Sequence, residues 1–111
     1  RRPGRGGRGA LGGASERSEF QHILVFRSRV FGRCLSLDGV LQSTELDEHV
    51  YHEFLVHVPL ALHACPRRVL VCGGGNGGAA REALKHPSVV GVTVAEIDTA
   101  VADVAPRWVP P

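Results

Sequence analysis

The 111-residue sequence contains no methionine, one tryptophan, one tyrosine and three cysteines. No apolar run approaches the roughly 20 residues that cross a bilayer, and the Arg/Gly-rich start lacks the apolar segment of a signal peptide. These absences favour a cytoplasmic protein without a membrane partner. Because the cysteines show no C-x-x-C spacing, they predict neither a disulfide framework nor a zinc ribbon. We interpret them as buried or half-buried packing residues, namely Cys34, Cys65 and Cys72.

The positive charge is concentrated at the start of the chain. The formal net charge is +2, with 13 Lys and Arg against 11 Asp and Glu, and four arginines fall within the first ten residues. Without them the balance is 9 against 11, or −2, so no nucleic-acid footprint remains elsewhere. Low apolar content predicts a disordered Gly/Arg-rich leader over residues 1–18. Such a tract can also bind RNA, but we favour an unstructured segment.

From Phe20 the composition changes to short runs rich in β-forming residues, which begin with ILVF at 23–26 and continue with RCLSL at 33–37. Asp38-Gly39 separates the latter run from Val40. This dipeptide is a strong hairpin signal, since a type I′ turn needs positive φ at both central residues. We therefore expect a small antiparallel sheet.

A helix is predicted over about 47–63. Thr44 is the expected N-cap, and Glu45, Asp47 and Glu48 are interpreted as first-turn acids that the helix dipole favours. Apolar residues at helical spacing mark the amphipathic face, and Pro59 is expected to kink the helix. The spaced apolar residues are Val50, Phe54 and Val58, with Tyr51, Leu55 and Leu62 beside them.

The second half has the order of a βαβ unit. The run RVLVC at 68–72 is a short apolar strand, GGGNGG follows it, and a helix is expected from about Gly78 to His86. A second strand is expected at 92–96 and a further helix from about Asp98. The predicted fold class is therefore α/β, with an antiparallel β-domain followed by the first βαβ unit of a truncated Rossmann-like domain.

The glycine loop carries the clearest functional signal. Gly73, Gly75 and Gly78 satisfy G-x-G-x-x-G, which lets the backbone turn tightly and approach a ligand. Glu96 ends the next strand 18 residues after Gly78, where an acid can accept both ribose hydroxyls. This context indicates a nucleoside-type ligand, either an S-adenosyl compound or NAD. Asn76 at the loop tip slightly favours a ligand with an amine or sulfonium.

No metal site is predicted. His52-Glu53 begins like the H-E-x-x-H motif of zinc proteases, but the next histidine is His57, one residue too late. A spacing of five residues turns the side chain by about 140° around a helix. No ligand spacing stands out among the six histidines at 22, 49, 52, 57, 63 and 86.

Taken together, the strings LDGVLQSTE, YHE, HVPL, GGG-x-GG, REALKHPSV and EID resemble spermidine synthases, the polyamine aminopropyltransferases, over roughly 80 residues. The resemblance implies a spermidine synthase-type N-terminal oligomerisation β-domain plus helix at 19–66 and a partial Rossmann-like transferase domain at 67–111. It also implies transfer of an aminopropyl group from decarboxylated S-adenosylmethionine to putrescine, giving spermidine and methylthioadenosine. Neither an organic cofactor nor a metal is expected, and the full-length family is expected to form homodimers or homotetramers.

By motif, Gln21, Gly73, Gly75 and Glu96 are expected to bind the adenosyl donor. The polyamine side is expected to contain Tyr51, His52 and Asn76. Position 76 is usually Asp in the family, so Asn76 removes a counter-charge for a substrate ammonium. Leu46 likewise replaces a usual Arg.

The family's proton-accepting Asp belongs to later strands, so no catalytic residue is assigned within these 111 residues. The chain starts at Arg1 and stops at Pro111, and we expect an N-terminal fragment that is inactive by itself. The alternative is a non-catalytic spermidine synthase homologue or an S-adenosyl-type nucleoside-binding module.

Overall fold

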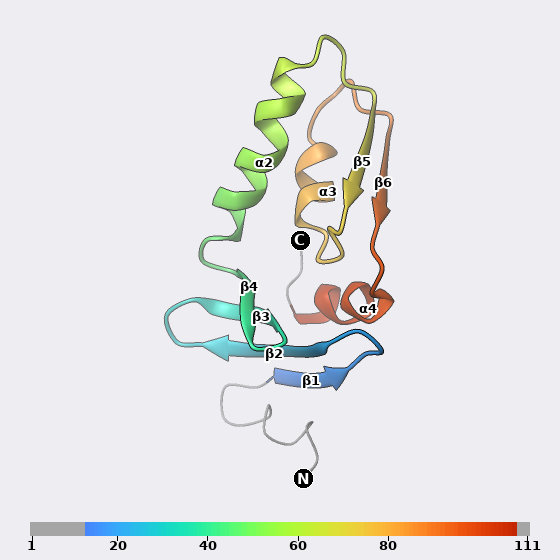
Figure 1. Cartoon of the computed structure of the whole chain (residues 1–111). Coiled ribbons are helices and arrows are strands. Elements are labelled where there is room, and N and C mark those ends of the chain that lie inside the picture. Colours follow the sequence, from blue (N-terminus) through green and yellow to red (C-terminus); the bar gives the residue numbers. More distant parts are fainter. Residues whose placement is uncertain (1–12, 109–111) are drawn as a thin grey trace.

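The computed structural model describes residues 13–108, with side chains described up to Val104. It contains two sheets: four antiparallel strands in the order β1-β2-β3-β4, and two parallel strands, β5 and β6. In Figure 1 the antiparallel sheet lies below, and the parallel pair stands above it beside α2 and α3. The predicted fold class, an antiparallel unit followed by a βαβ unit, is confirmed.

The antiparallel sheet is built from consecutive hairpins. Its strands are β1 (Gly13–Arg17), β2 (His22–Ser28), β3 (Gly32–Leu37) and β4 (Val40–Thr44). At the β3–β4 turn, Asp38 has φ 51° and Gly39 has φ 80°. Both central residues are thus left-handed, as the Asp-Gly signal predicts. Asp38 also accepts a hydrogen bond from the His22 backbone N–H through Oδ1 at 2.9 Å, which ties the turn to β2.

The predicted disordered leader is wrong for its last part, because Gly13–Arg17 form β1. This edge strand pairs with β2 from Gly13↔Phe26 to Arg17↔His22. Its polar sequence gives no alternating apolar pattern, but backbone pairing needs none on an edge. Side chains add one link, a 2.7 Å hydrogen bond between Ser15 Oγ and His22 Nε2. The rest of the predicted leader, residues 1–12, lies outside the described residues.

Helix α2 (Glu48–Leu62) contains Pro59, and its N-cap lies three residues after the predicted N-cap, Thr44. Thr44 is the last residue of β4, and its hydroxyl donates to Asp47, the actual N-cap residue. The predicted apolar face is also wrong, because Val50 is 61% and Phe54 74% exposed. The buried face instead carries His52 and Val56.

The βαβ unit consists of β5 (Arg68–Cys72), α3 (Gly78–Ala83) and β6 (Gly91–Ala95), and α4 (Thr99–Trp108) follows it. The strands pair in parallel from Arg68↔Gly91 to Cys72↔Ala95. Helix α3 lies between α2 and the parallel pair (Figure 1). Its helical end comes at Ala83, three residues before the predicted end at His86, because a turn follows.

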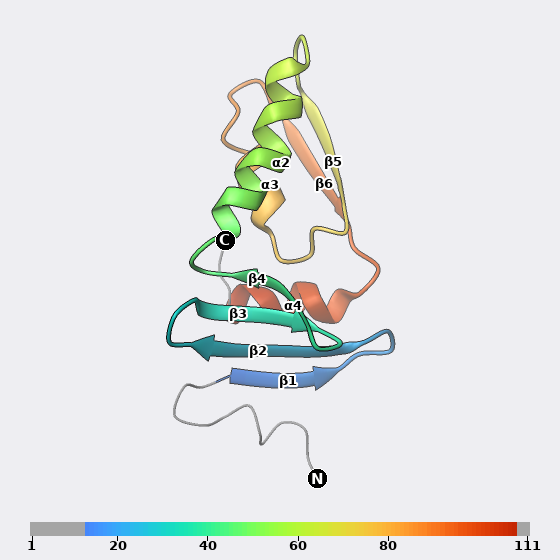
Figure 2. The same cartoon turned by 60° about the vertical axis from the view of Figure 1, so that its left-hand side comes forward.

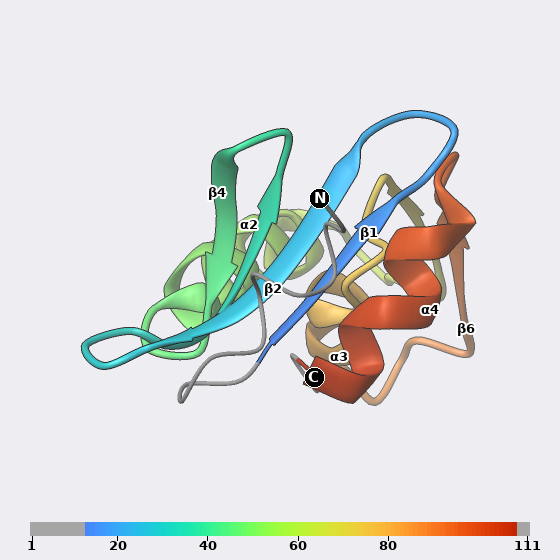
Figure 3. The ribbon, with the colours of Figure 1, turned by 90° about the horizontal axis from the view of Figure 1, so that it is seen from below.

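Two apolar clusters form the core. The first joins Ile23, Val25 and Leu35 of the antiparallel sheet to Val101 and Val104 of α4, and Figures 2 and 3 show α4 beside that sheet. The second packs α2 against α3 and one face of the parallel pair, through Val56, Ala79 and Ala83 with Leu60, Val69, Val71 and Val92. None of the helices in residues 13–108 is both long and apolar enough to span a membrane.

Candidate functional site

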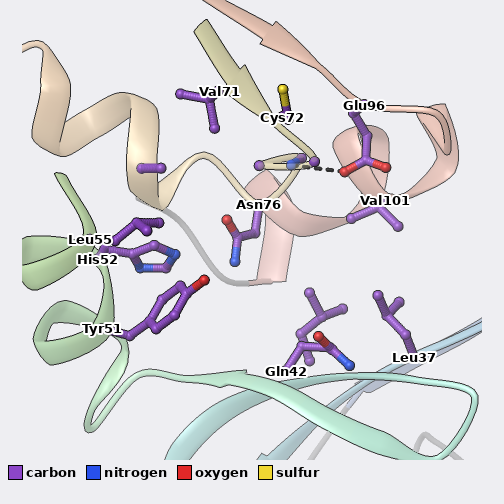
Figure 4. Close-up of a pocket in the computed structure, with 15 residues that line it drawn as sticks. Leu37, Gln42, Tyr51, His52, Leu55, Val71, Cys72, Asn76, Glu96 and Val101 are labelled. Atoms are coloured by element: carbon purple, nitrogen blue, oxygen red, sulfur yellow. Dashed lines mark hydrogen bonds between the residues drawn. The ribbon is translucent and has the colours of Figure 1, made fainter. Parts of the chain in front are cut away.

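A pocket of about 360 Å³ opens where the glycine loop, α2 and the antiparallel sheet meet. Figure 4 shows Tyr51 and His52 on one side, Glu96 and Cys72 on the opposite side, and Leu37 and Gln42 below. The pocket is thus walled by elements that are far apart in the sequence. It lies at the carboxyl end of β5, where ligands of open α/β sheets usually bind.

The glycine loop and Glu96 are joined directly. Gly75 N–H donates to Glu96 Oε1 at 3.0 Å, and Asp98 N–H donates to Glu96 Oε2 at 3.1 Å. A Cβ on Gly75 would lie 2.6 Å from Glu96 Oε1, so the close approach requires glycine. Gly73 lines the pocket and turns the chain with φ 85°. The structure therefore brings Gly73, Gly75 and Glu96 together as the sequence predicts.

Asn76 also lines the pocket, near the centre of the view in Figure 4. Its Oδ1 accepts a hydrogen bond from the Gly78 backbone N–H at 3.2 Å, at the start of α3. This bond uses part of the acceptor capacity of a neutral side chain. Asn76 therefore contributes an amide dipole to the pocket and no net charge.

His52 is held at the pocket wall by a charged pair that the sequence analysis did not assign to the site. Glu48 Oε2 lies 2.6 Å from His52 Nδ1. Arg81 donates to both Glu48 oxygens, from Nη1 to Oε1 at 2.8 Å and from Nη2 to Oε2 at 2.9 Å. The Arg81 hydrogen bond keeps the pKa of the Glu48 carboxyl below its usual value, against the effect of burial. Glu48 is thus more than a first-turn acid that the helix dipole favours.

Glu48 and Arg81 belong to a charged cluster that also contains Glu82 and Lys85. Glu82 is 1% exposed. Glu82 accepts from Arg81 Nε at 2.7 Å and Lys85 Nζ at 2.8 Å, and its Oε1 lies 2.9 Å from His57 Nε2. Burial alone would raise its pKa, but the hydrogen bonds from Lys85, His57 and Arg81 outweigh burial and lower the pKa to about 2. His57 Nδ1 also lies 2.7 Å from His86 Nε2.

Gln21 is the one predicted site residue that does not line this pocket. Its Nε2 donates to Asp98 Oδ2 at 2.7 Å, and the Ser18 hydroxyl donates to the same oxygen at 2.7 Å. Asp98 is 2% exposed, and the Ser18 hydrogen bond is the main cause of the lowered pKa of its carboxyl. Since Asp98 N–H holds Glu96, Gln21 is connected to the pocket only indirectly. Its role in donor binding stays a prediction.

The described residues 13–108 contain no group of three or more His, Cys, Asp or Glu side chains that could hold a metal ion. The interpretation of the cysteines is wrong for two of them: Cys34 is buried, whereas Cys65 and Cys72 are exposed. Cys72 lines the pocket at the end of β5. Burial raises the pKa of the Cys34 thiol.

The residues that the sequence analysis missed are Glu48, Arg81, Glu82 and Asp98. Glu48 and His52 are four residues apart on one helix, a spacing that places two side chains on the same face. That signal was present in the sequence. Arg81, Glu82 and Asp98 also contact Glu48, His57 and Gln21 on distant elements, and no local spacing indicates these contacts. The one local signal for Glu82 is Lys85, three residues later.

Comparison with known families gives two matches that together cover most of the chain. The model of the spermidine synthase tetramerisation domain matches residues 15–45, and that of the spermine/spermidine synthase domain matches residues 48–110. Helix α2 therefore falls within the second match. The predicted boundary at residue 66 stays a prediction.

Curated relatives agree with these models. A polyamine aminopropyltransferase of a Thermoanaerobacter species is 53% identical over 95 residues, covering 86% of this chain and 34% of the relative. The spermidine synthase of Dictyostelium discoideum is 52% identical over 95 residues, with the same coverage of 86% and 34%. The chain thus spans about a third of the length of the curated relatives it matches.

A solved structure has the same fold. The crystal structure of spermidine synthase from Thermotoga maritima matches with a TM-score of 0.83 and 44% identity, over 85% of this chain and 33% of that one. A spermidine synthase in complex with the transition state analogue AdoDATO also matches, with a TM-score of 0.83, 44% identity and coverage of 85% and 32%. With the family models, these likenesses show that the chain belongs to the spermine/spermidine synthase family of polyamine aminopropyltransferases and corresponds to its N-terminal third.

Proposed function

We propose that the pocket binds decarboxylated S-adenosylmethionine beside putrescine, as the N-terminal part of a spermidine synthase. The observation that carries this proposal is the contact of Glu96 with the glycine loop at the pocket. Each carboxylate oxygen has two acceptor positions, and each Glu96 oxygen uses one for a backbone N–H. One position per oxygen is left for the two ribose hydroxyls.

The amine acceptor is proposed to lie near Tyr51 and His52, on the opposite side of the pocket from Glu96, and near Asn76 between the two sides (Figure 4). This arrangement places a nucleoside donor and an aliphatic amine on two sides of one cavity. In the proposed reaction, the deprotonated amine attacks the carbon beside the sulfonium, and methylthioadenosine leaves. Orientation of the two substrates is the contribution of these residues. The proton acceptor is proposed to be an Asp that belongs to the remainder of the family fold.

The donor half of the proposal is tested with methylthioadenosine, which contains the ribose and adenine of the donor. Titration of the 111-residue chain by calorimetry should give saturable binding. Glu96→Gln should weaken it roughly tenfold, because a charge-assisted acceptor becomes a neutral one. Glu19→Gln removes the same charge at an exposed site and should leave the affinity unchanged. Equal affinities for the wild type and Glu96→Gln would contradict the role of Glu96.

The amine half is tested at Asn76. Asn76→Asp should tighten putrescine binding by about 10- to 150-fold, since a carboxylate adds a charge-assisted hydrogen bond to an ammonium. Isothermal titration with putrescine measures the change, and a neutral diol of the same length is the control ligand. Unchanged putrescine affinity would exclude Asn76 from the amine site.

Asn76 also supports a second candidate, a non-catalytic homologue whose nucleoside site is retained. Turnover distinguishes the two functions only in a chain that includes the whole family fold. For residues 1–111 we expect no aminopropyl transfer from decarboxylated S-adenosylmethionine to putrescine. Any rate above background would refute this expectation.

The match to a tetramerisation domain supports the proposal that the protein forms homodimers or homotetramers. The cytoplasmic location stays a prediction.

A further inference from the structure

We propose that Glu48, together with Arg81, is a positioning residue that holds His52 in the tautomer whose Nε2 accepts a hydrogen bond from an aliphatic ammonium in the pocket. The proposal rests on the proposed function for the identity of the ligand. Glu48 itself does not line the pocket, so it acts through His52. The tautomer, in contrast, follows from contacts within the protein.

The identity of the donors decides where the His52 proton lies. A guanidinium has only donors, so both Arg81 contacts make Glu48 the acceptor. The Arg81 hydrogen bond lowers the pKa of the Glu48 carboxyl, which is therefore ionised near neutral pH. An ionised carboxylate cannot donate a proton to the imidazole. At the 2.6 Å contact, His52 Nδ1 must consequently carry the hydrogen.

Packing keeps the imidazole in place. His52 is 5% exposed, and its ring lies against the first residue of α3. A Cβ on Gly78 would lie 2.3 Å from His52 Cε1 and 2.6 Å from Nε2, so only glycine leaves room for the ring. Arg81 is fixed in turn, because its Nε donates to the buried Glu82 at 2.7 Å. The Glu48 carboxylate is thus held from both helices.

The other ring nitrogen of His52, Nε2, can accept a hydrogen bond from the ammonium, whereas Asn76 has only part of its acceptor capacity left. Among the residues that the structure describes, His52 Nε2 has no hydrogen-bond partner, and His52 lines the pocket next to Tyr51. In a neutral imidazole with a proton on Nδ1, Nε2 carries a lone pair. Asn76 Oδ1 already accepts from Gly78 N–H. We infer that the Nε2 lone pair is a main acceptor for the ammonium N–H.

The wild-type chain provides the first test. In the 111-residue protein labelled with ¹⁵N-histidine, long-range ¹H–¹⁵N spectra at about pH 8, where an ordinary imidazole is neutral, distinguish the two tautomers. We expect the His52 Nδ1 resonance of a protonated nitrogen and the Nε2 resonance of an unprotonated one. A proton on Nε2 in the wild type would overturn the proposal without any variant.

The second test compares Glu48→Gln with Glu53→Gln, which removes the same charge from an exposed position of α2. Glu48→Gln should lower the ratio of Nδ1–H to Nε2–H tautomer roughly tenfold and weaken putrescine binding by a similar factor. Glu53→Gln should change neither quantity. Circular dichroism checks that both variants fold. If Glu48→Gln does not fold, the ¹H–¹⁵N spectrum of the wild type alone tests the predicted His52 tautomer.

The outcomes separate the two proposals. A wild-type tautomer ratio and wild-type putrescine affinity in Glu48→Gln would overturn the role of Glu48. If the tautomer responds as expected but the wild type does not bind putrescine, the proposed amine function fails and the positioning of His52 by Glu48 stands.

Discussion

The two sheets differ in how their strands are held and covered. In the antiparallel sheet, neighbouring strands are consecutive in sequence, and Ile23, Val25 and Leu35 are at most 2% exposed beneath α4. In the parallel pair, Leu70 is 64% and Val94 39% exposed. Only one face of that pair packs against helices within the described residues, through Val69, Val71 and Val92.

The difference shows two ways of stabilising a small unit. The antiparallel sheet combines tight turns, which need few ordered residues, with a buried apolar cluster. The parallel strands need a crossover, so their pairing depends on how α3 packs. That packing combines a few small apolar residues with charged groups, because Glu48, Arg81 and Glu82 connect α2 to α3.

The largest expected effect is a loss of stability when a buried apolar side chain of the antiparallel sheet is removed, compared with an exposed one of the parallel pair. Ile23→Ala should lower the free energy of unfolding by about 3 kcal/mol, because a buried side chain is replaced by a cavity. Leu70→Ala removes a side chain of similar size from an exposed position and should cost less than about 0.5 kcal/mol. Urea unfolding followed by circular dichroism measures both. Equal losses would mean that the two sheets are covered alike.

A smaller effect is expected at the start of α3. Gly78→Ala should destabilise the chain by about 2 kcal/mol, because the new Cβ would overlap the buried His52 ring. Gly91→Ala is the matched control in β6, where a Cβ meets nothing within 4 Å, and should lie within about 0.5 kcal/mol of the wild type. Thermal melts of both variants give the comparison. A Gly78→Ala variant as stable as Gly91→Ala would show that the α2–α3 contact is loose.

The smallest expected effect concerns the charged cluster between the helices. Glu82→Gln should cost about 1.5 kcal/mol near neutral pH, a modest value because Lys85 is largely exposed. A carboxyl whose folded pKa is lowered stabilises the fold above its unfolded pKa of roughly 4.3, and this contribution is lost as the pH falls toward about 2. Urea titrations at successive pH values should therefore show the two proteins converging between about pH 4.3 and 2. Glu16→Gln, at an exposed position, should follow the wild type throughout, and a constant gap for Glu82→Gln would contradict the prediction.

Much of the local structure could be predicted from the sequence. The β3–β4 turn follows from Asp38-Gly39, since few other residues adopt positive φ twice in succession. Strand β5 has the predicted bounds, Arg68–Cys72, and Gly75 and Glu96 meet as the glycine motif implies. These features depend on short-range steric rules that a single segment contains.

Other features could not be predicted because they depend on distant partners. The apolar spacing of α2 identifies a helix, but α3 packs against the face that carries His52 and Val56 instead of the face that carries Val50 and Phe54. Strand β1 has no apolar signal of its own, and it exists because β2 offers a free edge. In both cases the neighbouring element determines the outcome.

The sequence by itself determined the order of strands and helices after β1, the family, and the glycine loop with its acid, because nearby residues or motifs specify each of them. Only the tertiary structure decided which charges meet. Glu48 and Arg81 are separated by 33 residues, and Gln21 and Asp98 by 77. Hydrogen bonds act over about 3 Å, so pairs this far apart in the chain become partners only after the helices and sheets have packed.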